Sequence, residues 1–517
     1  MIINFLIKNA KQFPDRAAII VSDKTYTYSE LTEDVKCLSQ LLENVGVQKK
    51  EHILILLDNS YEFVVTMFAV ANLGAVLVPI NTTMSDDAIE KAMKSSDIQY
   101  IIGLSNVIKQ HADKLQTILD SKKWIVVGEK VLESKVFQDI KRYRTKTYSL
   151  GQYDIDITSP YILTMTSGST GEPKPIIFSQ ETKINRAMLS AKELYGLIQE
   201  DVIIASSPMY HSLAQRLVLL PIMLGATSVL LKKFNPQVWL EAVEKHKVSF
   251  AILVASNLEL LLLKLKEKTF NLDSLRTVVS SSALLKDDIK SECIKQFNAD
   301  FHEMYGASEI GTATNLSPND SKNKVSSVGT PLRYVDLKIV DDNGEEVVAN
   351  TEGEIICKTL TKFVGYYKNE KATNESVKNG YFYTGDIGYV DDEGFLYFKG
   401  RKKDVINVGG TLVYPKDIED VISKFEFVEE CAVIGVDDIY FGEAVVAVIV
   451  PKKNMDFNLT KIKLECRNSL ADFQQPMGYE IIEALPKNSM GKVMKFKIQE
   501  MFKDYDASAL IRKLMKI

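Results

Sequence analysis

The chain has 517 residues and a formal net charge of −5, with 46% hydrophobic and 25% charged residues. This length exceeds one typical hydrophobic core, so we expect at least two domains of an ordinary globular protein. A net acidic chain is not expected to coat nucleic acid, and an anionic ligand would need local basic groups. The five cysteines are scattered and form no C-x-x-C pair. They fit a reducing compartment, the cytoplasm, with no disulfide framework and no zinc site.

The apolar segments of the chain do not predict a membrane protein. The N-terminal apolar stretch, residues 1–8, is too short for a signal peptide, and its pattern continues as an amphipathic helix through Phe13. The longest apolar stretches are Phe63–Ile80, which contains Asn72, and Leu217–Leu231, which is too short to span a bilayer. We interpret both as buried helix-to-strand segments and expect no transmembrane segment.

Residues 1–150 alternate between helical and strand-like patterns. Helices are predicted at residues 29–45, 61–73 and 85–96, and strands at residues 24–28, 52–57, 75–80 and 99–103. This alternation is typical of a mostly parallel sheet covered by helices. Residues 121–157 are polar, and we expect them to be irregular.

The stretch Thr164–Lys174 combines five hydroxyl residues, two glycines and a lysine. Short apolar segments at Tyr161–Leu163 and Pro175–Phe178 flank it, which predicts a strand, a loop and a second strand. Glycines let backbone N–H groups turn inward together, so such a loop suits a polyphosphate. It is not a Walker A loop, because a proline follows its lysine. Taken alone, the loop is equally consistent with a solvated turn between two hairpin strands.

After this loop, four predicted strands each end in small residues that carry polar groups. The strands cover residues 202–206, 249–254, 275–280 and 300–305, and helices are predicted at residues 182–195, 214–224 and 237–246. Ligands of open α/β sheets bind at the carboxyl ends of the strands. We therefore expect the loop, His211, Ser281 and Glu309 to lie at such ends.

From about residue 325 the pattern changes to short alternating strands with turns at Asp341–Gly344 and Asp391–Gly394, which predicts antiparallel β-structure. The charged run Gly400–Asp404 breaks this pattern, and a compact α+β stretch follows. The predicted fold is α/β, with a large N-terminal domain, residues 1–401, of helix-covered sheets and a β-rich part. A small α+β C-terminal domain, residues 402–517, completes it.

Five motifs occur in order along the chain: Thr166–Lys174, Tyr305–Glu309, Tyr383–Asp386, Gly400–Asp404 and Pro486–Lys492. Their order and separations resemble the adenylate-forming superfamily, of the acyl-CoA synthetase type, and the resemblance covers nearly the whole chain. The resemblance implies an AMP-forming acid–thiol ligase with ATP, Mg²⁺ and CoA as cofactors. Such an enzyme makes an acyl-adenylate from a carboxylic acid and ATP, releases pyrophosphate, and passes the acyl group to the CoA thiol. A medium aliphatic acid or an aryl acid is the expected substrate.

The resemblance also assigns roles to residues. Glu309 would bind Mg²⁺, Asp386 would accept hydrogen bonds from the ribose hydroxyls, and Lys492 would act in adenylation, with His211 near the carboxylate. The residues expected to bind ATP are Thr166, Ser167, Gly168, Ser169, Thr170, Gly171, Lys174, Ser281, Ser282, Ala283, Met304, Tyr305, Gly306, Ser308, Asp386 and Arg401.

The remaining roles concern the second half-reaction and the acid. Lys403 matches the hinge about which the mobile C-terminal domain would rotate, bringing Gly409 and Gly410 into the thiol tunnel, where glycine lets the backbone approach a thin ligand. The acyl pocket is expected to include Tyr210, Ser212, Leu213, Val254 and Gly311.

Several departures from the family pattern keep alternatives open. No acid lies near Tyr210, which argues against an α-amino acid substrate. Leu470–Pro476 lacks a lysine that many CoA ligases carry, so the acceptor could instead be the pantetheine of an acyl carrier protein. The sequence does not decide whether Arg216 faces the pocket, nor whether the chain forms a homodimer. A nucleotide-binding protein without catalysis is disfavoured by the intact motifs, and a luciferase-like oxygenase shares every motif.

Overall fold

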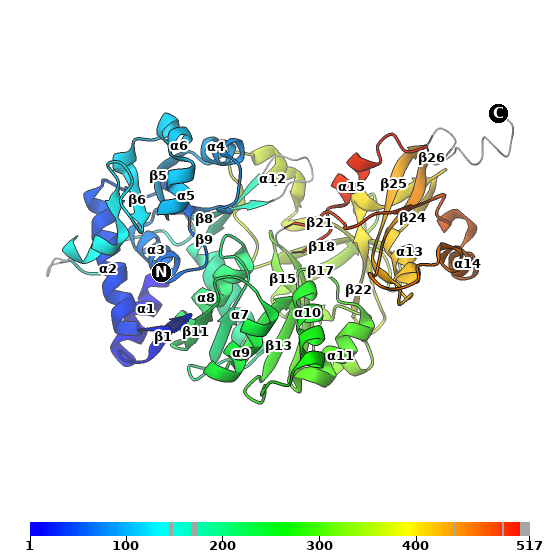
Figure 1. The fold of residues 1–517 in the computed structure, drawn as a ribbon, viewed down its shortest axis with the longest axis horizontal. Helices are drawn as coiled ribbons and strands as arrows, with labels where there is room; N and C mark the ends of the chain where they lie inside the picture. Colours follow the sequence, from blue (N-terminus) through cyan, green and yellow to red (C-terminus); the bar gives the residue numbers. More distant parts are fainter. Residues whose placement is uncertain (144–147, 167–173, 439–440, 489–490, 507–517) are drawn as a thin grey trace. The chain divides into compact units, whose positions relative to one another are not determined.

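The computed structural model describes residues 1–143, 148–166, 174–438, 441–488 and 491–506 (Figure 1). The chain divides into two compact units. The first comprises Met1–Asp336 and Lys358–Phe382, and the second comprises Leu337–Cys357 and Tyr383–Ile517. The domain boundary expected at residues 401–402 stays a prediction.

A nine-stranded sheet carries the second half of the first unit. Its order is β16 (Thr330–Pro331), β15 (Gly311–Leu316), β14 (Asp300–Ala307), β13 (Thr277–Ser281), β12 (Phe250–Val254), β10 (Val202–Ala205), β11 (Thr227–Leu230), β1 (Ala17–Val21) and β2 (Lys24–Thr27). The six strands from β14 to β1 pair in parallel, so their carboxyl ends share one edge of the sheet.

Helices cover this sheet. They are α7 (Gln180–Glu193), α8 (Ser212–Leu224), α9 (Pro236–His246), α10 (Ala255–Glu267) and α11 (Asp287–Phe297) (Figure 1). Trp239 of α9, Leu258 of α10 and Phe297 of α11 pack in one buried cluster with strand residues Ala251 and Val278. Apolar helix stripes thus cover a continuous apolar sheet face, as expected for parallel strands buried on both faces.

The other sheet of the first unit has eight strands. Its order is β19 (Gly365–Tyr366), β9 (Lys174–Ser179), β8 (Pro160–Thr166), β4 (Val76–Pro79), β3 (His52–Leu56), β5 (Ile98–Leu104), β6 (Trp124–Val127) and β7 (Lys135–Val136). The helices of this part are α1 (Ile2–Gln12), α2 (Tyr28–Asn44), α3 (Tyr61–Leu73), α4 (Asp86–Ser95), α5 (Ser105–Gln110), α6 (Ala112–Ile118) and α12 (Glu370–Ser376). Strands β8 and β9 pair antiparallel with Thr166 opposite Lys174, which confirms the predicted strands on either side of the loop.

The helix predicted at residues 29–45 is found as α2, and Thr27 and Glu30 form a capping box at its N-terminus. Two local predictions were wrong. Residues 121–157 are not wholly irregular, since β6 adds to the parallel sheet beside β5. Strand β12 does not end in a loop, because α10 begins at once with Ala255.

The second unit contains most of a five-stranded sheet that confirms the predicted antiparallel region. It consists of β17 (Val335–Val340), β18 (Gly353–Thr359), β21 (Tyr381–Val390), β20 (Val377–Lys378) and β22 (Leu396–Arg401). The division between the units crosses β17, β18 and β21. Gly344 and Gly394 lie in the two predicted turns.

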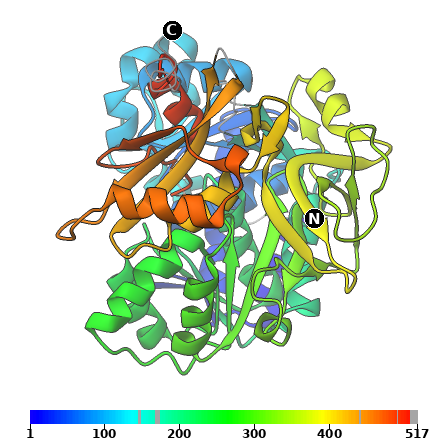
Figure 2. The same ribbon diagram turned by 90° about the vertical axis from the view of Figure 1, so that its right-hand side faces the viewer.

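The last part of the chain forms another five-stranded sheet, of β24 (Thr411–Val413), β23 (Ile406–Val408), β26 (Gly442–Pro451), β25 (Val428–Asp438) and β27 (Gly478–Ile481). Its helices are α13 (Pro415–Ile422), α14 (Leu459–Ser469) and α15 (Lys495–Met501). Val433 of β25 belongs to the cluster under α13 and α14, whereas its neighbours Ala432 and Ile434 belong to the cluster under α15. The period-two alternation therefore buries both faces of these long strands, coloured orange in Figure 2. Together the two units confirm the predicted fold class.

In the part of the chain that the structure describes, no helix is both long enough and apolar enough to cross a membrane.

Candidate active site

The carboxyl ends of the parallel strands bring several of the predicted residues of the first unit together. Val254 pairs with Ser281 across β12 and β13, and Ser280 pairs with Glu303 across β13 and β14. The chain then leaves each strand at the same edge of the sheet. The segment after β10 leads to His211, which immediately precedes α8. His211, Ser281 and Glu309 therefore lie at the carboxyl edge of the sheet, as predicted.

Glu309 is held in place through both its backbone and its side chain. Its carbonyl oxygen accepts hydrogen bonds from Arg186 Nη2 at 3.0 Å and from the Phe363 N–H at 2.6 Å. Its Oε1 accepts a hydrogen bond from the Tyr366 hydroxyl at 2.9 Å. No donor among the described residues bonds to Oε2. The carboxylate is thus oriented through Oε1, while Oε2 accepts no hydrogen bond within the described part of the chain.

This donor set fits Mg²⁺ better than a metal that proteins hold in a complete cage. Within the described ranges, no group of three or more His, Cys, Asp or Glu residues could hold a metal ion. Mg²⁺ commonly binds through one or two carboxylates while waters and substrate phosphates supply its other oxygen ligands. A single oriented carboxylate meets that requirement.

The turn that presents Glu309 depends on a close approach between two backbone segments. A Cβ atom at Gly306 would lie 1.9 Å from the Gly311 carbonyl oxygen, so only glycine fits there. The Thr361 hydroxyl donates to the Ile310 carbonyl oxygen at 2.6 Å and closes the other side of the turn. Ser308 is exposed at the tip.

Ahead of this turn, Met304 and Tyr305 lie in β14, and both are buried. The Thr312 hydroxyl donates to Met304 Sδ at 3.3 Å, which ties β14 to β15.

The segment Ser281–Ala283, expected beside adenine, leaves β13 through a left-handed residue. Ser282 has φ +72°, a conformation that non-glycine residues rarely adopt. Ser281 is buried, while Ser282 and Ala283 are exposed.

His211 is a half-buried residue at the start of α8. Its ring centroid lies 4.4 Å from that of Tyr210. Desolvation by burial lowers the pKa of His211 to about 4. The imidazole is therefore neutral near neutral pH, so it can take part in hydrogen bonding or shape the pocket without carrying charge.

Two buried cations on α7 were missed by the sequence prediction. Lys183 Nζ donates to Ser212 Oγ at 3.0 Å and to Gln215 Oε1 at 2.6 Å, and so fixes the first turn of α8. Desolvation, with a smaller effect of Arg186, lowers the pKa of Lys183 well below its ordinary value. Arg186 donates from Nε to the Thr361 carbonyl oxygen at 2.8 Å, and burial lowers its pKa to about 9.

A sequence signal for these cations existed. The buried side of α7 contains small or polar residues rather than large apolar ones; its members are Gln180, Thr182, Lys183, Arg186, Ala187, Ser190 and Ala191. A helix whose buried side is polar must pack against other polar groups inside the domain.

In the second unit, Asp386 and Arg401 are cross-strand partners on β21 and β22. Arg401 Nε lies 2.9 Å from Asp386 Oδ1, and Asp386 is only 2% exposed. The Thr384 hydroxyl accepts the Asp386 N–H at 3.0 Å and donates to the Ile355 carbonyl oxygen at 2.7 Å, so the acid is firmly placed. A buried carboxylate paired with guanidinium is a strong acceptor for paired hydroxyl donors.

Lys492 belongs to the same unit and interacts electrostatically with Asp386 and Arg401. Asn488 Oδ1 accepts the Lys492 N–H at 3.0 Å, which holds the turn that presents the lysine. Desolvation and then the Arg401 guanidinium lower the pKa of Lys492, while Asp386 opposes them. Lys492 nevertheless keeps solvent access.

The predicted hinge and tunnel residues lie close together in the chain. Lys403 is exposed in a short 3₁₀ helix, Lys402–Asp404. Gly409 and Gly410 form the two-residue turn between β23 and β24, with φ +57° and +90°. Such a turn needs positive φ at both positions, so turn geometry alone accounts for both glycines.

The central part of the phosphate loop lies outside the described residues. It contains the predicted ATP ligands Ser167, Gly168, Ser169, Thr170 and Gly171. Thr166 ends β8, and Lys174 begins β9 as a half-buried residue.

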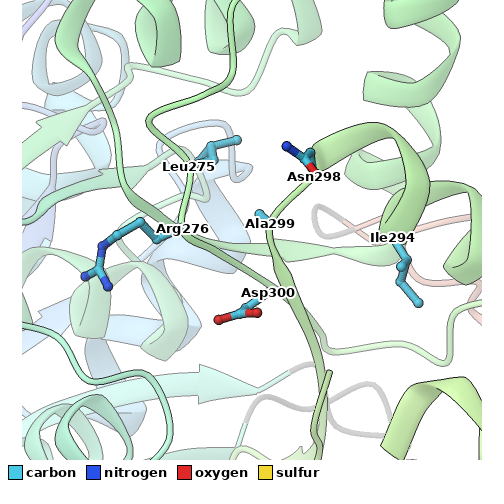
Figure 3. A pocket seen from close by; sticks show the side chains of 6 residues that line it. All are labelled: Leu275, Arg276, Ile294, Asn298, Ala299 and Asp300. Atoms are coloured by element: carbon cyan, nitrogen blue, oxygen red, sulfur yellow. The ribbon is translucent and has the colours of Figure 1, made fainter. Parts of the chain in front are cut away.

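A surface hollow of about 530 Å³ lies at the opposite edge of the nine-stranded sheet (Figure 3). It is lined by Leu275, Arg276, Ile294, Asn298, Ala299 and Asp300. These residues surround the amino ends of β13 and β14, whereas Ser281 and Glu309 follow the carboxyl ends. Arg276 also pairs with Asp201 at 2.6 Å. The hollow is therefore separate from the candidate site.

Comparison with known proteins decides the family. The AMP-binding enzyme family matches residues 6–367, and the AMP-binding enzyme C-terminal domain matches residues 417–492. The chain belongs to the AMP-binding enzyme family. The predicted AMP-forming acid–thiol ligase class is confirmed.

The similar curated proteins are CoA ligases of matching length. The chain is 28% identical to a long-chain-fatty-acid–CoA ligase of Bacillus subtilis, with 96% of this chain and 94% of that protein covered. It is 30% identical to a 2-succinylbenzoate–CoA ligase of Listeria monocytogenes, with 96% and 99% covered.

Solved structures of o-succinylbenzoate CoA synthetase from Bacillus subtilis share the fold. A complex with its acyl-adenylate intermediate has a TM-score of 0.85 at 25% identity and covers 96% of this chain and 98% of that one. A complex with ATP and a magnesium ion has a TM-score of 0.82 at 26% identity, covering 95% and 98%. These comparisons confirm ATP, Mg²⁺ and CoA as the cofactors of this enzyme type.

Proposed function

We propose that this protein activates a carboxylic acid as an acyl-adenylate at the strand edge around Glu309 and then transfers the acyl group to CoA. The observation that carries the proposal is the oriented Glu309 carboxylate: its Oε1 accepts from the Tyr366 hydroxyl, and Arg186 fixes the Glu309 backbone through its carbonyl oxygen. In-line attack on the α-phosphate requires phosphate charge to be neutralised and the reactants to be positioned.

In the first half-reaction, residues from both units have roles. Glu309 would hold Mg²⁺ on the phosphates, and the loop between Thr166 and Lys174 would bind the β- and γ-phosphates. The Mg²⁺ ion supplies charge neutralisation when bound. Asp386 would accept the ribose hydroxyls, with Arg401 beside it.

Lys492 is the proposed catalytic residue of adenylation. Its electrostatic contact with the Asp386–Arg401 pair supports a position beside the nucleotide. A protonated amine there can neutralise charge shared between the acid's oxygen and the α-phosphate. Neutral His211 would face the acid.

In the second half-reaction, we propose that the C-terminal domain, residues 402–517, rotates about Lys403. Lys492 would leave the nucleotide, and the turn at Gly409 and Gly410 would line the path of the pantetheine arm. Exposure of Lys403 is compatible with a hinge, because no buried packing has to be broken there.

The second candidate acceptor is the pantetheine of an acyl carrier protein. The segment Leu470–Pro476, which includes the exposed Phe473, lacks the lysine found in many CoA ligases. This difference is the reason to keep a carrier protein as the alternative acceptor. The five free cysteines support the cytoplasm as the compartment. A homodimer also stays a proposal, to be tested by light scattering.

The deciding experiment supplies purified protein with ATP, Mg²⁺ and a panel of carboxylic acids that includes medium aliphatic acids and aryl acids. Release of AMP and pyrophosphate is measured with and without CoA, and thioesters are identified by mass spectrometry. Acid-dependent release with a CoA thioester supports the ligase. Adenylate formation without a CoA-dependent product would overturn the choice of CoA and favour a carrier protein.

A further inference from the structure

Arg216 lies on α8, beside residues predicted to line the acyl pocket. It follows Ser212 by four residues on α8, so the two side chains share one helix face a turn apart. Its Nη1 donates to Thr312 Oγ1 at 3.2 Å, and Thr312 follows the pocket residue Gly311 on β15. The guanidinium thus contacts β15 next to one predicted pocket residue, and it follows another by one turn of α8.

This guanidinium is buried with unused donors. Arg216 is 8% exposed, and its Nε and Nη2 have no hydrogen-bond partner among the described residues. The Tyr195 hydroxyl is also buried, and Arg216 interacts with it through its charge and through a side-chain contact outside standard hydrogen-bond geometry. Buried donors of this kind are rare in native proteins unless a ligand or water satisfies them.

Nearby charges do not neutralise Arg216. Arg186 on α7 interacts electrostatically with Arg216 and carries the same sign. The Glu309 carboxylate accepts from Tyr366 and faces Arg186 electrostatically. The Lys183 amine is engaged by Ser212 and Gln215 and adds no negative charge. An uncompensated buried cation is costly, and an anion that enters the pocket would remove that cost.

We propose that Arg216 determines specificity by binding a second carboxylate at the far end of the acid, so that the substrate is a dicarboxylic acid. The inference rests on the proposed function, because it names the substrate class of the same site. A guanidinium fork matches a carboxylate through two parallel N–H donors, here Nε and Nη2. The Tyr195 hydroxyl would donate a third hydrogen bond to that carboxylate. The first carboxylate is left for adenylation.

The test compares linear α,ω-dicarboxylic acids from malonate to sebacate, and aromatic diacids, with monocarboxylic acids of the same length. Acid-dependent AMP release is measured for the wild type, Arg216→Met and Arg216→Lys. Arg333→Met is the matched control, because Arg333 is exposed and pairs only with Glu193 in the described structure. Thermal shift without ATP measures diacid binding independently of catalysis.

We expect the wild type to prefer one diacid over its matched monoacid by about a hundredfold in kcat/KM, the scale for hydrogen bonds to a charged group. Arg216→Met should lose this preference and gain monoacid activity, Arg216→Lys should be intermediate, and Arg333→Met should match the wild type. A diacid should raise the melting temperature of the wild type but not of Arg216→Met. Because a buried unpaired charge is removed, Arg216→Met should remain folded without ligand.

Equal use of monoacids by the wild type and Arg216→Met would overturn the role of Arg216 and leave the ligase function intact. If none of the acids in the panel supports AMP release, the proposed function is overturned instead. In that case the thermal shift still decides whether Arg216 binds a diacid, because it needs neither ATP nor turnover.

Discussion

The Tyr366 hydroxyl donates a hydrogen bond to Glu309 Oε1 at 2.9 Å, although 57 residues separate the two in the chain. Tyr366 lies on β19 of the eight-stranded sheet, whereas Glu309 follows β14 of the nine-stranded sheet. The proposed metal ligand is therefore positioned by a residue of the other sheet. Its orientation depends on how the two sheets of the first unit pack.

Tyr366→Phe should raise the Mg²⁺ concentration needed for half-maximal adenylation by about tenfold, since a hydrogen bond to a charged group contributes about 1.5 kcal/mol or more. Mg²⁺ titrations of ATP–pyrophosphate exchange measure this. The matched control is Tyr367→Phe, because Tyr367 bonds to Asp97 at 2.7 Å instead. Identical Mg²⁺ dependence in the two variants would show that Tyr366 does not position Glu309.

Lys492→Ala should slow acyl-adenylate formation by about a hundredfold or more, because it removes a positive charge that stabilises the transition state. Thioester formation from supplied acyl-adenylate should change little. Both half-reactions are measured separately by rapid quench, with the exposed Lys503→Ala as control. Equal loss in the two half-reactions would contradict the role given to Lys492.

Gly409→Asn distinguishes a role of Gly409 in forming the turn from its proposed role in lining the pantetheine path. Asparagine tolerates left-handed φ, and Asn-Gly is a favoured turn pair, so the melting temperature should stay unchanged. A side chain at this position should obstruct the pantetheine path and slow thioester formation by tenfold or more, on the order expected for misplaced reactants. Adenylation should be retained. Unchanged thioester formation would leave Gly409 with a turn role only.

The neutral state of His211 has consequences for stability at acid pH. Its folded pKa of about 4 lies below the ordinary 6.5, so the unfolded chain binds a proton between these values and the folded chain does not. The contribution of His211 to stability is therefore complete above pH 6.5 and is lost as the pH falls toward 4. His211→Asn should make unfolding free energy depend less steeply on pH in this window, as measured by urea unfolding. An unchanged slope would mean that His211 titrates normally.

The sequence predicts the fold and much of the site because several signals depend only on local patterns. Strand periodicity locates β10, β12, β13 and β14, and their polar ends place Ser281 and Glu309 at one edge. Cross-strand pairing of Asp386 with Arg401 follows from two motifs that flank a single turn.

What the sequence could not predict depends on long-range packing. Tyr366 contacts Glu309 only because β19 joins a different sheet, which no local pattern encodes. The burial of Arg216 follows from the packing of α8 against β15, so its orientation was left open until the structure placed its guanidinium on Thr312. Strand β6 was missed because its four apolar residues lie within a long stretch of polar sequence.

The most direct test of the central claim follows the oxygen of the acid. A carboxylic acid labelled with oxygen-18 in its carboxylate is turned over with ATP, Mg²⁺ and CoA, and the products are analysed by mass spectrometry. Attack of the carboxylate on the α-phosphate followed by thiolysis transfers one labelled oxygen to AMP, and this labelled AMP is the predicted result. Unlabelled AMP, or label in inorganic phosphate, would contradict an acyl-adenylate intermediate.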